Sequence, residues 1–114
     1  WAALLPAVLA ALPVLAAERP IALTVAAGQI DEICFEAKAG QAIHWRFNAD
    51  APVAFNLHHH VGQKVVMPVD LKDVRGHEGR HVAEVANHWC LMWTAPKNAP
   101  ARIEGGFATD DIVR

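Results

Sequence analysis

The chain has 114 residues, which is the size of a single domain, and its formal net charge at pH 7 is −2. This balance lacks the surplus of Lys and Arg with which nucleic-acid-binding proteins neutralise phosphates. Hydrophobic residues make up 54% and charged residues only 19%, which argues against a disordered chain. The sequence contains no Ser and no Tyr, so a Ser nucleophile and a Tyr general acid are both excluded.

Residues 1–17 predict a secretory signal peptide. They are uncharged, rich in Ala and Leu and interrupted by two prolines, so the stretch is too short and too broken for a membrane span. It ends in small residues, and we expect cleavage after Ala16 or Ala17. A basic start is missing, so we expect part of the leader to precede Trp1. The mature chain, residues 18–114, is then one exported domain, periplasmic or secreted, with no stable membrane insertion.

The mature chain predicts an all-β fold. Residues 42–48 alternate with period two, which places Ile43, Trp45 and Phe47 on one face of a half-buried strand. Turn signals recur at roughly ten-residue spacing, and the polar, Gly-containing segment 70–79 is expected to be a loop. These features indicate an antiparallel β-sandwich of about seven to eight short strands. The predicted strands are residues 21–25, 30–37, 42–48, 53–60, 64–69, 80–86, 87–95 and 101–107.

Cys34 and Cys90 are the only cysteines. An even count in a small exported domain indicates a disulfide, and only one pairing exists. On the chain-entropy model such a bridge would stabilise the fold by about 4 kcal/mol. The alternative is a free thiolate that acts as a metal ligand.

The segments around these cysteines resemble the GOLD domain of the p24 cargo-receptor family. The resemblance lies in residues 34–36 (Cys-Phe-Glu) with the strand at 43–47, and in residues 87–93 with the loop and apolar strand that follow. It implies a β-sandwich bridged from one side to the other by Cys34 and Cys90. Members of that family continue into a coiled coil and a transmembrane helix, neither of which occurs in this sequence. Only the fold and the disulfide are therefore expected to carry over, with a cupredoxin-like arrangement as the other option.

The histidines, seven in all, carry the prediction of function. On a strand, residues two apart point to the same face and lie about 6.5–7 Å apart. His58 and His60 therefore form a pair able to converge on one metal ion. His59 is expected to point the opposite way, toward the apolar side.

Further donors fall on neighbouring segments. His88 and Met92 share a face of residues 87–95 with Cys90, and His44 lies on the polar face of its own strand. Imidazole suits copper, zinc or nickel, and a thioether shifts the preference toward copper(I). The predicted metal ligands are His58, His60, His88, Met92 and His44.

Other readings of these residue types are weaker. A blue-copper site needs a His and then a Met soon after its Cys, and no His follows Cys90. His77 and His81 are expected in or beside the 70–79 loop, either completing a site or serving as plain loop residues. The tryptophans of the mature chain are expected to pack in the core: Trp45, Trp89 and Trp93.

The sequence therefore predicts an exported β-sandwich that binds a metal ion, copper first and zinc second, for sequestration, delivery or sensing in the cell envelope. The alternative is a non-enzymatic GOLD-like interaction module without metal, whose partner is an envelope protein. Nucleic acid is not an expected partner. No enzyme is predicted, because no Gly-rich phosphate loop occurs and the acidic residues are scattered, apart from residues 31–32 and 110–111.

Overall fold

The computed structural model describes residues 18–110, and these form six β-strands without a helix. Every pairing between strands is antiparallel, so the all-β, antiparallel prediction is confirmed. The predicted signal peptide lies outside the described residues. The strands are β1 (Arg19–Val25), β2 (Ile30–Ala37), β3 (Ala42–Val61), β4 (Lys64–Val82), β5 (Asn87–Thr94) and β6 (Ala101–Asp110).

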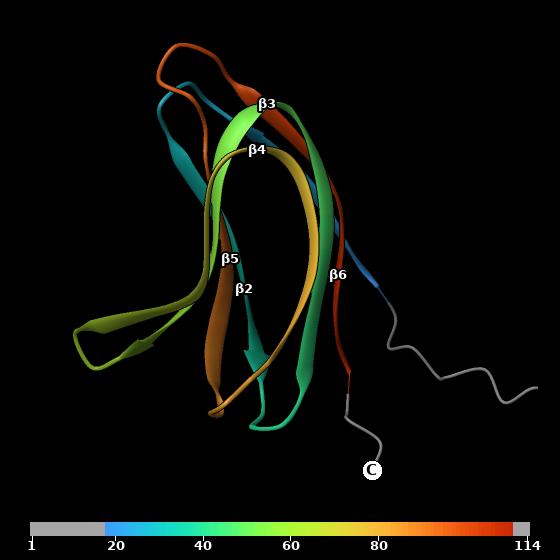
Figure 1. The fold of residues 1–114 in the computed structure, drawn as a ribbon, viewed down its shortest axis with the longest axis vertical. Helices are drawn as coiled ribbons and strands as arrows, with labels where there is room; N and C mark the ends of the chain where they lie inside the picture. Colours follow the sequence, from blue (N-terminus) through green and yellow to red (C-terminus); the bar gives the residue numbers. More distant parts are fainter. Residues whose placement is uncertain (1–17, 111–114) are drawn as a thin grey trace, which may run out of the picture.

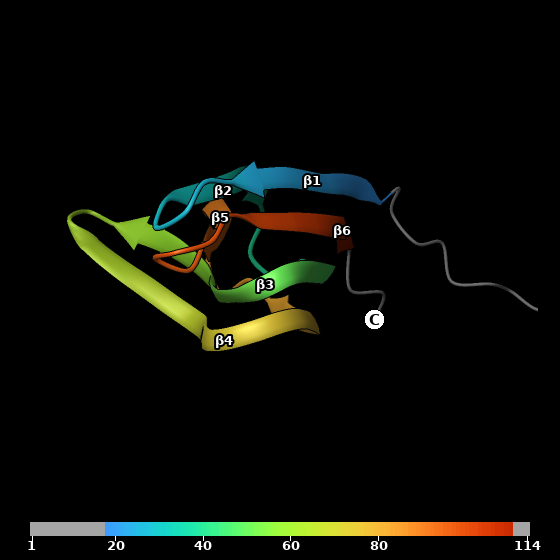
Figure 2. The same ribbon diagram turned by 90° about the horizontal axis from the view of Figure 1, so that it is seen from above.

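One strand, β3, belongs to two layers. Its first half, residues 42–49, pairs with β6, and its second half, residues 54–59, pairs with β5. On its other edge, β4 follows it along almost its whole length. Figure 1 shows β3 and β4 arching together from one layer to the other, and Figure 2 shows the curled sheet from above. We call the two layers the β6 layer, with β1 and β6, and the β5 layer, with β2 and β5.

The strand count is six rather than the predicted seven to eight, because the predicted turn at 50–52 is a bend within β3. The register with β4 shifts between Asn48 and Val53, and Asp73 on β4 has a φ of 55°. Such bulges bend a strand without ending it. Asp50 is held at the bend, since its Oδ1 accepts a 2.7 Å hydrogen bond from the Arg102 backbone N–H.

The predicted loop at 70–79 is also wrong, since these residues form part of β4. Its glycines serve close approach between strands: a Cβ on Gly79 would lie 2.5 Å from the Trp45 ring. The indole N–H of Trp45 donates a 3.0 Å hydrogen bond to Nδ1 of His77. His77 and His81 are therefore strand residues.

Aromatic side chains fill the space between the layers. Phe47 of the β6 layer meets Trp93 of the β5 layer edge-on, with ring centroids 5.6 Å apart. Phe35 and Phe107 make a second contact between the layers at 5.2 Å. The predicted inward faces of residues 43–47 and 87–93 are thereby confirmed, since Trp45, Trp89 and Trp93 are all buried.

The predicted disulfide between Cys34 and Cys90 is confirmed. The two residues are directly opposite in the register of β2 and β5, with Cα atoms 4.1 Å apart. The expectation of a bridge across the sandwich is wrong, because both side chains point outward from a single layer. Alternation along each strand decides this, since the neighbours Phe35 and Trp89 point into the core. The alternative of a free thiolate is also wrong.

Replacing both Cys34 and Cys90 by Ala should lower the free energy of unfolding by about 4 kcal/mol, because the bridge closes a long loop in the unfolded chain. Urea denaturation followed by tryptophan fluorescence measures the change. The wild-type chain treated with a reducing agent is the control and should unfold at a similar urea concentration. A loss below about 1 kcal/mol would contradict the entropic account.

Candidate functional site

The outer face of the β5 layer gathers four of the five predicted ligands. The register aligns His58, Cys90 and Cys34 in one row across β3, β5 and β2. Asn56, Met92 and Glu32 form the next row in the same way. We call this surface the His58 face; its members are Glu32, Cys34, Glu36, Asn56, His58, His60, His88, Cys90 and Met92.

His58 is the buried centre of this face, with only 4% of its surface exposed. Its Nδ1 lies 2.6 Å from Oδ1 of Asn56. Because an amide oxygen only accepts, Nδ1 carries the proton and the lone pair is on Nε2. Nε2 in turn lies 3.6 Å from a carboxylate oxygen of Glu32.

Burial lowers the pKa of His58 below its ordinary value, because a charged imidazolium is poorly solvated there. The Glu32 carboxylate acts in the opposite sense, and the imidazoles of His60 and His59 add to the lowering. The neutral ring, with its lone pair on Nε2, is therefore favoured at neutral pH.

Glu32, His58 and Cys90 each offer one donor atom, and these atoms all lie within 4.8 Å of one another. The Cys90 sulfur is bonded to Cys34 and is therefore no thiolate. His60 is exposed, and its ring lies perpendicular to that of His58 with centroids 5.3 Å apart. Glu32 is not among the predicted ligands, although it lies two residues before Cys34 and so shares that side chain's face.

Two more of the predicted ligands, His88 and Met92, come from β5. Met92 stands between Glu32 and Asn56 in the register. His88 is exposed, and its Nε2 lies 3.4 Å from a carboxylate oxygen of Glu36. The structure thus brings His58, His60, His88 and Met92 onto one face.

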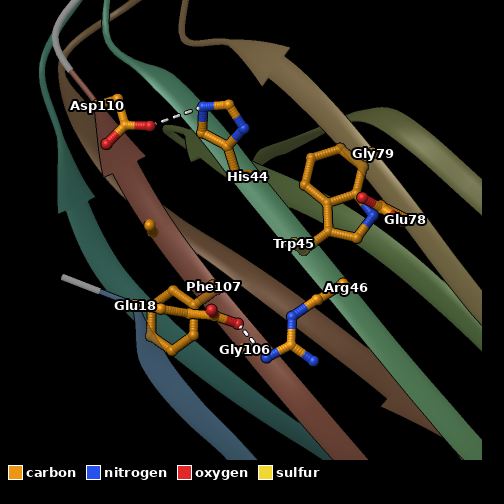
Figure 3. Close-up of a pocket in the computed structure, with 10 residues that line it drawn as sticks. Glu18, His44, Trp45, Arg46, Glu78, Gly79, Gly106, Phe107 and Asp110 are labelled. Atoms are coloured by element: carbon orange, nitrogen blue, oxygen red, sulfur yellow. Dashed lines mark ion pairs between the residues drawn. The ribbon is translucent and has the colours of Figure 1, made fainter. Parts of the chain in front are cut away.

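His44 lies apart from these, on the outer face of the β6 layer, where it borders a shallow pocket of about 260 Å³. Two ion pairs cross this pocket: His44 with Asp110 at 3.0 Å and Arg46 with Glu18 at 2.6 Å. Figure 3 shows both pairs beside the indole of Trp45. These four side chains are thus paired with each other across the pocket.

The end of the β3–β4 hairpin carries exposed apolar side chains. In the described part of the chain, four of the six large apolar residues that are exposed lie here. The hairpin extends beyond the other strands in both views (Figures 1 and 2). We call this end the apolar tip; it consists of Val61, Val65, Val66 and Met67.

His59 lies at the base of the apolar tip and points into the core, as predicted. It is 4% exposed, and its ring packs on Trp89 with centroids 4.1 Å apart. The adjacent backbone is also held, since the Asn87 side-chain amide donates a 2.8 Å hydrogen bond to the His60 carbonyl. The tip is therefore anchored to the β5 layer.

Residues 18–110 contain no helix with the length and apolar character needed to cross a bilayer. A structural disulfide forms and persists in oxidising compartments, so the Cys34–Cys90 bridge fits the predicted export of the chain.

Comparison with solved structures relates this fold to that of a known protein. No protein-family model matches the chain, and no characterised sequence matches it significantly, so the GOLD-domain resemblance stays a prediction. The fold is similar to PliG of Aeromonas hydrophila, a periplasmic inhibitor of g-type lysozyme, with a TM-score of 0.61. The match covers 83% of this chain and 88% of PliG at 10% sequence identity. At that identity the similarity shows a common fold.

The His58 titration tests the geometry of the site. We expect its pKa in the folded chain to lie below 6.5, and Glu32→Gln should lower it further by removing the carboxylate that raises it. NMR of the ring protons measures both values. An unchanged or raised pKa in the Glu32→Gln chain would contradict the contact.

The same shift predicts the pH dependence of stability. The unfolded chain binds the His58 proton more readily than the folded chain, so stability rises with pH in this range. The contribution is fully present above about 6.5, the unfolded value, and is lost as the pH falls through the lowered folded value. Urea denaturation of the wild-type and His58→Gln chains, at pH values between the folded and the unfolded pKa of His58, measures this contribution to the free energy of unfolding.

Proposed function

We propose that this chain is a periplasmic, non-enzymatic interaction module that binds a partner protein through the apolar tip. The observation that carries the proposal is the exposure of Val61, Val65, Val66 and Met67 together at the end of a protruding hairpin. Clustered exposed apolar side chains mark interaction sites, whereas singly scattered ones do not. These four side chains lie outside the core between the layers, so core packing does not explain why they are apolar.

The tip is built to bind without large rearrangement. Its strands remain paired up to the turn, with His60 opposite Val65 and Val61 opposite Lys64. Gly62 occupies the left-handed region of the turn with a φ of 62°. A preorganised surface loses less conformational entropy when a partner binds, which favours affinity.

The structural relation to PliG supports a protein partner. PliG is an inhibitor of g-type lysozyme, and it has the same fold over 83% of this chain. An exported domain of this shape that binds a cell-wall hydrolase would meet its partner in the periplasm. We therefore infer that the partner is an extracytoplasmic protein, with a lysozyme as the first class to test.

The test compares Val→Asp substitutions at the tip with a Val→Asp substitution elsewhere. The full chain should bind g-type lysozyme, and the double variant Val65→Asp, Val66→Asp should bind at least about tenfold more weakly, because carboxylates cannot be buried there without cost. Isothermal titration calorimetry measures the affinity, and a lysozyme activity assay shows whether binding inhibits.

Val85→Asp is the matched control, since Val85 is 41% exposed but lies outside the tip. It should leave the affinity unchanged. Equal affinities for all three chains would show that the tip is not the binding surface. Absence of any complex with lysozyme would contradict the partner class.

A further inference from the structure

We infer that the His58 face binds a divalent metal ion of the copper–zinc type, held by Nε2 of His58, the Glu32 carboxylate and the His60 imidazole. This inference goes beyond the interaction function and rests on a different surface. It starts from the separation between two donor atoms that come from distant parts of the sequence.

The distance between the donor atoms of His58 and Glu32 matches the separation of two ligand atoms bound to one zinc ion. Zinc–nitrogen and zinc–oxygen bonds of about 2.0–2.1 Å place two ligands of a tetrahedral ion about 3.3 Å apart. Nε2 of His58 and Oε2 of Glu32 are 3.6 Å apart. This is too long for a hydrogen bond between them and close to the separation across a metal ion.

The chemistry of the two atoms also suits a cation between them. With the proton on Nδ1, Nε2 presents a lone pair, and the Glu32 carboxylate presents lone pairs as well. Two electron-pair donors that face each other are stabilised by a positive ion between them.

Asn56 supplies the support that metal-binding histidines commonly have. Its Oδ1 lies 2.6 Å from Nδ1 of His58, and both side chains are buried. A hydrogen bond to the other ring nitrogen fixes the tautomer and the ring orientation of a ligating histidine. Asn56 is thus a positioning residue, and His58 is held with Nε2 toward Glu32 before any ion arrives.

The donor set decides the class of ion. The sulfur of Cys90 borders the site but is tied to Cys34, so no thiolate is offered. Imidazole and carboxylate donors suit Cu(II) and Zn(II), whereas thiolate and thioether favour Cu(I). The thioether of Met92 favoured Cu(I) in the sequence analysis, whereas the donors His58 and Glu32 favour a divalent ion.

His60 completes the set as the third ligand. It lies two residues after His58 on the same face, with the ring centroids 5.3 Å apart. Its side chain is exposed and free to turn toward the ion. Three protein ligands leave one coordination position open.

The experiment titrates the full, oxidised chain separately with Cu(II) and Zn(II), in competition with a chelator of known affinity. We expect one ion per chain. Glu32→Gln should weaken binding at least tenfold, and because Glu32 is 44% exposed this change leaves the fold intact. Asn56→Ala should weaken it by about 10- to 100-fold, and Asn56→Asp, which keeps an acceptor for Nδ1, should restore it.

Two controls separate a folded site from a run of histidines. His44→Ala removes an imidazole from the other layer and should leave the affinity unchanged. The chain unfolded in urea keeps all three adjacent histidines and should bind the ion much more weakly. In Cu(II) electron paramagnetic resonance, the wild type should show two coupled nitrogens and His60→Ala should show one.

Several results would overturn the inference. These are absence of stoichiometric binding, equal affinities of wild type and Glu32→Gln, or equal affinities of the folded and unfolded chains. A metal-free chain that still binds lysozyme would leave the proposed interaction function standing, so the two proposals fail independently.

Discussion

The paired strands β3 and β4 run through both layers, and the rest of the structure depends on that continuity. Because β3 gives its first half to β6 and its second half to β5, one strand fixes the position of both layers. The bend between Asn48 and Val53 sets where they separate, and Asp50 is tied there to the backbone of Arg102 on β6. Near this end, the Gly28 N–H donates a 2.7 Å hydrogen bond to the Pro96 carbonyl, which joins the turn after β1 to the loop after β5. The aromatic core fills the space so created.

The same strand also positions the two candidate functional surfaces. Beyond the bend, the odd-numbered residues Phe55, Leu57 and His59 point into the core, and the even-numbered residues face outward. The outward-facing residues of this half of β3 lie beside the disulfide that joins β5 and β2. That bridge holds β2, which carries Glu32, next to β5, which pairs with the part of β3 that carries His58. Beyond His59, β3 is no longer paired with β5 and continues, paired with β4 alone, to the apolar tip. His60 belongs to the His58 face and directly precedes Val61 of the apolar tip, so the proposed metal site adjoins the base of the proposed partner-binding hairpin.

The burial of His58 shows how an outward-facing residue acquires unusual chemistry. Among residues 18–110 no third layer covers this face, and yet His58 is 4% exposed. Its neighbours on three strands surround it with an amide, a carboxylate, a disulfide and another imidazole. Such surroundings favour the neutral ring and orient its free nitrogen. On the other layer, His44 also faces outward, but its side chain is 36% exposed and is paired with Asp110.

The sequence by itself determined the all-β class, the pairing of the only two cysteines, the inward faces around Trp45 and Trp89, and the common face of His58 and His60. The pairing follows from the count of cysteines, and the others follow from alternation along a strand, which is a local property. Only the tertiary structure decided that residues 42–61 form one strand, because a bend with bulges and a turn have the same local composition. Gly79 looks like a turn residue in sequence, but its purpose is to admit the Trp45 ring. The approach of Glu32 to His58 depends on strand order and register, since 26 positions of chain separate them, and no local pattern encodes which strands become neighbours.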